Sequence, residues 1–162
     1  MGRQRVFHSS DGKYKVLLTA ASVHSLVARC SEASDTETGG ILLGHYNAAH
    51  DTAIVSYVSE APTDSECGTT WFTRGVRGLQ RLISKFWRER EYYLGEWHFH
   101  PNGSATPSGQ DIAQMAEIAN TPSYHCPEPL LLVVGGKCEE YSFGAYVCLA
   151  SGHRQRLNEM ES

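Results

Sequence analysis

The sequence lacks several patterns that would indicate common protein classes. Its five cysteines include no CxxC pair, so neither a disulfide framework nor a cysteine-type zinc knuckle is indicated. No apolar run approaches the roughly 18 residues of a membrane span, and the opening MGRQRVFHSSDGKYK contains no apolar signal-peptide core. We therefore expect a cytoplasmic protein that does not associate with a membrane.

An excess of positive charge is also absent. The formal net charge is −4 with histidines neutral, which disfavours the basic surface that nucleic-acid binding normally needs. No GxGxxG or GKS pattern accompanies the glycines, so no nucleotide cofactor is expected. A chain of 162 residues has the length of one domain with a well-buried core, and we take 1–162 as a single domain.

Apolar periodicity predicts a mixed α/β fold. Strands are expected at 14–19, 41–46, 52–59, 130–135 and 141–149, with a helix capped by Ser22 after the first. Apolar residues at helical spacing predict an amphipathic helix over Thr73–Glu91, whose arginines are interpreted as a solvated face. Residues 62–70 and 120–129 show no periodic pattern and are expected to be loops.

The segment GEWHFHPNGSATPSGQD, at 95–111, is the most informative part of the chain. Alternate side chains of a strand share a face, so His98 and His100 are expected to point together, with Phe99 on the other side. Turn-forming residues follow, and Ser108 precedes an apolar helical pattern as an N-cap would. Asp111 then lies in the first turn of that helix, where its carboxylate could join the two histidines.

Two imidazoles and one carboxylate form the ligand set of a catalytic zinc ion, which leaves a coordination position open for water. Proton transfer needs a further group. Glu37 is the candidate, because it precedes the strand TGGILLGHY, which could run beside the strand that carries His98 and His100. Each element alone has an ordinary explanation: a half-buried HxH pair, a capping box, or a solvated glutamate before glycines. Their joint spacing favours a metal site, and His125, in the loop of 120–129, is a further candidate for lining it.

These residues together resemble the JAB/MPN (JAMM) zinc metallopeptidases. A glutamate before GGILLG, then HxH, seven residues that begin with Pro101, and SxxD, places Glu37, His98, His100, Ser108 and Asp111 at every position of that pattern. The segment GEWHFHP and the chain length most resemble the prokaryotic branch of this family. Phe99 departs from many relatives, which have serine or threonine there, and this bears on packing more than on metal binding.

The resemblance implies a cytidine-deaminase-like domain, in which helices flank a curved, mainly antiparallel sheet. It also implies zinc held by His98, His100 and Asp111, Glu37 as the proton carrier, and Ser108 as a donor to the oxyanion. The implied activity is cleavage after the C-terminal glycine of a ubiquitin-like protein or its conjugate, alongside operon-encoded conjugation enzymes, as in bacterial antiphage systems. Two alternatives remain open: processing of sulfur-carrier proteins, and a non-catalytic MPN scaffold.

Overall fold

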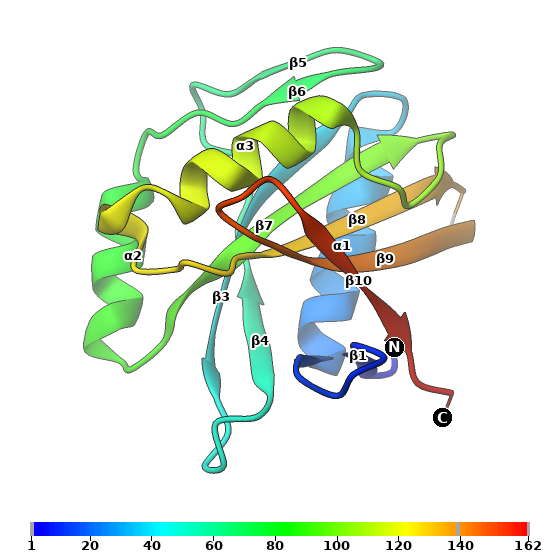
Figure 1. Cartoon of the computed structure of the whole chain (residues 1–162). Coiled ribbons are helices and arrows are strands. Elements are labelled where there is room, and N and C mark those ends of the chain that lie inside the picture. Colours follow the sequence, from blue (N-terminus) through cyan, green and yellow to red (C-terminus); the bar gives the residue numbers. More distant parts are fainter. Residues whose placement is uncertain (1, 139, 162) are drawn as a thin grey trace.

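The computed structural model describes residues 2–138 and 140–161 and has the expected mixed α/β composition (Figure 1). The helices are α1 (Ala20–Ala33), α2 (Leu79–Arg88), α3 (Gly109–Ala119) and a short 3₁₀ turn η1 (Pro122–Tyr124). The strands are β1 (Arg5–His8), β2 (Lys15–Leu18), β3 (Thr38–Tyr46), β4 (Ala53–Val58), β5 (Glu66–Cys67), β6 (Phe72–Thr73), β7 (Tyr92–Pro101), β8 (Leu130–Lys137), β9 (Glu140–Cys148) and β10 (Arg154–Glu159).

The main sheet is a closed barrel and not the curved sheet that the resemblance implied. Its strand order is β1-β10-β9-β8-β7-β3-β4-β2, and β2 pairs back with β1. Most pairings are antiparallel, while β2 with β4 and β7 with β8 run parallel. Closure depends on β1 and β10, which lie at opposite ends of the sequence and pair at Phe7↔Glu159. Their short, mixed sequences carried no strand signal.

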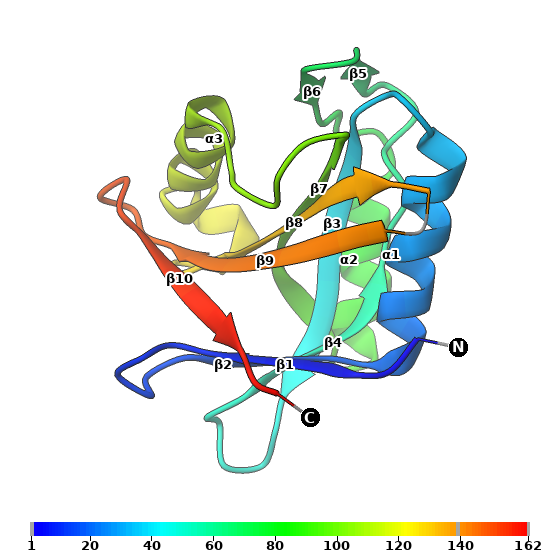
Figure 2. The same cartoon turned by 90° about the vertical axis from the view of Figure 1, so that its right-hand side faces the viewer.

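Two hydrophobic clusters occupy the two faces of this sheet. Alternation along β3 sends Leu42 into one cluster and Ile41 and Leu43 into the other. The first cluster also holds residues of α1, and the second holds residues of α2 and α3. Figure 2 shows the same arrangement, with α1 and α3 on opposite sides of the strands. Apolar side chains on both faces explain why β3 and β8 read as continuous hydrophobic runs.

Local boundaries differ from expectation in three places. Thr19, and not Ser22, is the N-cap of α1, and its side chain accepts a hydrogen bond from the Ser22 backbone N–H. The helix expected over Thr73–Glu91 spans only Leu79–Arg88, because Gly78 adopts a left-handed conformation (φ 80°) at its start. β5 lies within the predicted loop of 62–70 and pairs with β6, just beyond that loop, to form a small hairpin.

None of the described helices combines the length and hydropathy needed to cross a bilayer.

Candidate metal centre

The central strand β7 carries both histidines toward one end of the barrel. It lies between β3 and β8, with His98 opposite Gly39 on one side and Val133 on the other. Trp97 and Phe99 are fully buried in the cluster that contains α1, as strand alternation predicts. His98 is almost fully buried and His100 partly so, on the opposite face.

The third ligand candidate is positioned by the start of α3. Ser108 is the N-cap, and its Oγ accepts a hydrogen bond from the Asp111 backbone N–H at 3.1 Å. Asp111 Oδ2 in return accepts from the Ser108 backbone N–H at 2.8 Å, which completes the predicted capping box. The capping box therefore holds the Asp111 carboxylate in the orientation that faces the two histidines.

The structure brings the three predicted ligands together. Each of His98, His100 and Asp111 offers a ligand atom, and these atoms lie within 4.8 Å of one another. His98 Nδ1 lies 2.9 Å from Asp111 Oδ1, and His100 Nε2 lies 3.3 Å from Asp111 Oδ2. Burial alone would raise the pKa of Asp111, but hydrogen bonds from His100 and His98 hold it well below its usual value.

The donor set and its burial fit a metal ion. His98 Nε2 is buried, and no described residue hydrogen-bonds to it. An unsatisfied buried ring nitrogen is costly, and coordination to a cation would satisfy it. Two imidazoles and a carboxylate suit zinc and leave space for one further ligand.

Glu37 lies beside the three ligand candidates, just before the start of the neighbouring strand β3. It immediately precedes β3, and its Oε1 lies 3.7 Å from His100 Nε2. Burial raises the pKa of the Glu37 carboxyl above its usual value, partly offset by the nearby His100. Gly39 makes this approach possible, because a Cβ there would lie 2.4 Å from the Trp97 carbonyl oxygen and 2.9 Å from His98 Cδ2. A carboxyl with a raised pKa suits proton transfer near neutral pH.

The β5–β6 hairpin covers the same end of the molecule. Figures 1 and 2 both place it at the top of the molecule, at the opposite end from the β3–β4 turn. The Phe72 ring meets the His98 ring edge-on, with centroids 5.5 Å apart. The Gly68 carbonyl accepts a hydrogen bond from the Glu37 backbone N–H at 2.9 Å. The hairpin therefore contacts both His98 on β7 and Glu37, the candidate for proton transfer.

Sequence reasoning missed a buried charged network beside the ligands. Glu96 on β7 is fully buried and pairs with Arg74, whose side chain is only 3% exposed. A signal was available: Glu96 lies two residues before His98, so it shares the face of the histidines within an otherwise apolar strand. His125, interpreted as able to line the site, instead packs against Trp87 of α2, with ring centroids 5.6 Å apart.

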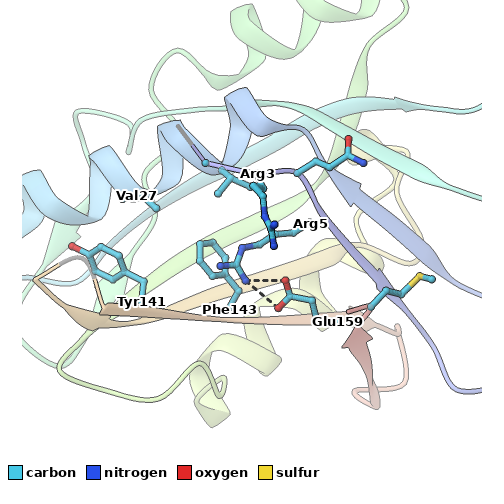
Figure 3. A pocket seen from close by; sticks show the side chains of 10 residues that line it. Arg3, Arg5, Val27, Tyr141, Phe143 and Glu159 are labelled. Atoms are coloured by element: carbon cyan, nitrogen blue, oxygen red, sulfur yellow. Dashed lines mark hydrogen bonds and ion pairs between the residues drawn. The ribbon is translucent and has the colours of Figure 1, made fainter. Parts of the chain in front are cut away.

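A separate cavity of about 350 Å³ lies between α1, β1, β9 and β10 (Figure 3). Arg5 Nη1 hydrogen-bonds both oxygens of Glu159, at 2.8 and 3.0 Å, and the guanidinium lies 4.1 Å from the Phe143 ring centroid. The Arg5 charge is thus already balanced, and none of the predicted site residues lines this cavity. The metal-ligand cluster remains the candidate site.

Comparison with known proteins establishes the family. The model for prokaryotic homologs of the JAB domain matches residues 19–148, which include the whole cluster. The chain belongs to the prokaryotic JAB family. This assignment agrees with the resemblance carried by the glutamate, HxHP and SxxD positions.

Several curated relatives of this JAB protein are similar over most of their length. A CD-NTase/cGAS isopeptidase from Enterobacter hormaechei is 39% identical over 155 residues, covering 95% of this chain and 86% of the relative. A second CD-NTase/cGAS isopeptidase, from Escherichia coli, is 28% identical, covering 82% and 83%. A probable metalloprotease, y4qB of Sinorhizobium fredii, is 25% identical, covering 77% and 78%.

The fold also has a solved counterpart. The solution structure of protein DSY2949 from Desulfitobacterium hafniense superposes with a TM-score of 0.63 at 19% identity, covering 89% of this chain and 88% of the other. At this identity the likeness concerns the fold.

Proposed function

We propose that this protein is a zinc-dependent isopeptidase that cleaves after the C-terminal glycine of a ubiquitin-like protein or its conjugate, with residues 1–162 acting as one peptidase domain. The observation that carries the proposal is the convergence of His98, His100 and Asp111 within 4.8 Å, with Glu37 alongside. Relatives named isopeptidase and metalloprotease support hydrolysis over a scaffold role. The ligands would be the two imidazoles and the Asp111 carboxylate.

The chain's own groups divide the work of hydrolysis. Zinc, when bound, supplies Lewis acidity that makes water more acidic and a carbonyl more electrophilic. The Glu37 carboxylate removes a proton from the attacking water and returns it to the leaving amine. The Ser108 hydroxyl donates a hydrogen bond to the oxyanion. Ser108 Oγ only accepts in the capping box, so its proton is available for that second role.

Substitution of Ser108 separates these two roles. Ser108→Ala should cost about 1 kcal/mol of stability through the lost cap, whereas Ser108→Gly should cost only a few tenths, because glycine is tolerated at N-caps. Both variants lose the hydroxyl, so both should lose about 10²- to 10³-fold in kcat. Urea unfolding and steady-state kinetics provide the measurements. A kcat that follows stability, with the glycine variant near wild type, would show that Ser108 is a cap alone.

The closed barrel limits where an extended substrate tail can pair. Each barrel strand already has two neighbours, while β5 and β6 form a two-stranded sheet outside it. An extended tail can add to such a sheet by main-chain hydrogen bonds, with side-chain pockets giving specificity. The hairpin lies directly against His98 and Glu37, so a tail paired with it would present its scissile bond to the site. This end of the site is tightly packed, since a Cβ on Gly39 would lie 2.8 Å from Phe72 Cε1, so we expect a tail residue without a side chain before the cut.

Tail selectivity tests the proposed activity. Fusions of a ubiquitin-like protein carrying Gly, Ala or Leu before the cut should be cleaved in that order of kcat/KM, with at least about tenfold between Gly and Leu, or about 1.4 kcal/mol. A chelator-treated sample controls for contaminating proteases. Equal cleavage of all three tails would reject this specificity, and no cleavage by zinc-loaded protein would favour a scaffold.

The names of the relatives support a particular setting. Two of them are CD-NTase/cGAS isopeptidases, so we include a conjugate containing a CD-NTase among the proposed substrates, in an antiphage system with operon-encoded conjugation enzymes. A fusion that carries a CD-NTase therefore belongs in the cleavage panel beside the ubiquitin-like fusions.

A further inference from the structure

The buried Arg74–Glu96 pair joins three segments of the chain. Arg74 follows β6, Glu96 belongs to the metal strand β7, and Arg74 Nη2 donates a 2.7 Å hydrogen bond to the hydroxyl of Tyr124 in η1. Arg74 Nη1 also donates to the Gly75 carbonyl at 2.9 Å, and the Tyr93 hydroxyl donates to Glu96. Both charged side chains are thus hydrogen-bonded as well as paired, which buried ions require.

The hairpin beside the active centre has little internal support of its own. Its two strands contribute two residues each and pair only with one another. Isolated two-stranded hairpins are marginally stable in water, so its position depends on external contacts. Asp64 caps the backbone N–H groups of Val76 and Arg77, but these bonds are exposed. The Arg74–Glu96 pair is a buried ionic contact that joins this segment to the barrel.

We propose that Arg74 and Glu96 are positioning residues for the reaction: their buried pair fixes the β5–β6 hairpin on β7, and the hairpin in turn fixes Glu37. This inference rests on the proposed function. The path runs through Gly68, whose carbonyl holds the Glu37 backbone N–H, and through Phe72, whose ring rests on His98. Neither charged group needs to touch substrate. A displacement of about 1 Å at a catalytic group can cost roughly 10²-fold in rate.

The decisive variant removes both charges together. Arg74→Met/Glu96→Gln leaves no unpaired ion in the interior and keeps a hydrogen-bond acceptor for Tyr93, so folding should survive. Arg74→Lys is the conservative counterpart, because it keeps a cation opposite Glu96. Arg77→Met is the matched control, since Arg77 is exposed, lies three residues away and bonds Asp64 through its backbone N–H, which the substitution keeps. All four proteins, wild type included, are compared as zinc-loaded full chains.

Three readouts separate positioning from simple destabilisation. In the double variant we expect the amides of Glu37 and Gly68 to exchange hydrogen at least about tenfold faster by local opening, with zinc content and global fold retained. We also expect kcat to fall and KM to rise, since the hairpin serves both Glu37 and the tail. Simple unfolding would lower the active fraction and leave KM unchanged. Arg74→Lys should recover most of the protection, and Arg77→Met should match wild type.

Unchanged exchange at Glu37 and Gly68 in the double variant would overturn the proposal, as would a fall in kcat with unaltered KM or a loss of zinc. Hydrogen exchange and zinc content need no substrate. If wild-type protein cleaves none of the fusions, the proposed function fails, while the exchange comparison still decides whether this pair positions the hairpin.

Discussion

Glu37→Gln is expected to keep its zinc and lose about 10²- to 10⁴-fold in kcat, the usual contribution of a proton-transfer group. Glutamine has nearly the same shape but cannot accept a proton at neutral pH. The fold should tolerate the change, because the backbone N–H of Glu37, which bonds Gly68, is unaffected. The carboxyl is also partly buried with a raised pKa, so a neutral amide suits its surroundings.

Metal analysis and single-turnover kinetics on the same preparation measure this effect. Glu32→Gln is the control, since Glu32 is an exposed carboxylate on α1. Near-wild-type turnover in Glu37→Gln with zinc present would remove Glu37 from the mechanism. Loss of zinc would instead make Glu37 a ligand, which its 3.7 Å approach to His100 makes worth testing.

His98→Ala/His100→Ala should abolish both zinc binding and turnover. Two of the three candidate ligands disappear, and one carboxylate does not hold zinc at a catalytic site. Bound zinc is expected to drop from about one ion per chain to none, as measured by atomic emission after dialysis. Asp111 should remain in place, because its carboxylate still accepts a hydrogen bond from the Ser108 backbone.

His24→Ala/His153→Ala provides the matched control, because both histidines are exposed and neither belongs to the cluster. It should keep zinc and turnover. Unchanged zinc stoichiometry in the double ligand variant would mean that the metal lies elsewhere, whereas zinc loss in the control would indicate surface binding.

The geometry of the candidate site was predictable where its determinants are local. Strand alternation places His98 and His100 on one face, and the capping box ties Asp111 to Ser108 through contacts three residues apart. Glu37 required one longer step, the antiparallel pairing of β3 with β7, which the apolar run TGGILLGHY indicated. Strand alternation and helix capping depend on residues close together in the chain, so both could be predicted from the sequence.

The remaining features depend on distant partners. Closure of the barrel needs β1 and β10 to pair across almost the whole chain, and four-residue or charged strands give no periodic signal. The contacts of the hairpin segment are with distant elements: Phe72 packs against His98 of β7, and Arg74 bonds Tyr124 of η1. Arg74 looked like the start of an amphipathic helix, because its burial is decided by Glu96, which lies in another element.

The two parts of the proposed machinery have separate origins in the chain. All three ligand candidates fall within residues 98–111, on one strand and the helix that follows it, whereas Glu37 lies just before β3, in the first third of the sequence. In the proposed mechanism, metal retention and bond cleavage can therefore be altered by separate mutations. Under the same mechanism, a single substitution at Glu37 would leave a protein that still holds zinc and still binds the proposed conjugates but no longer cleaves them.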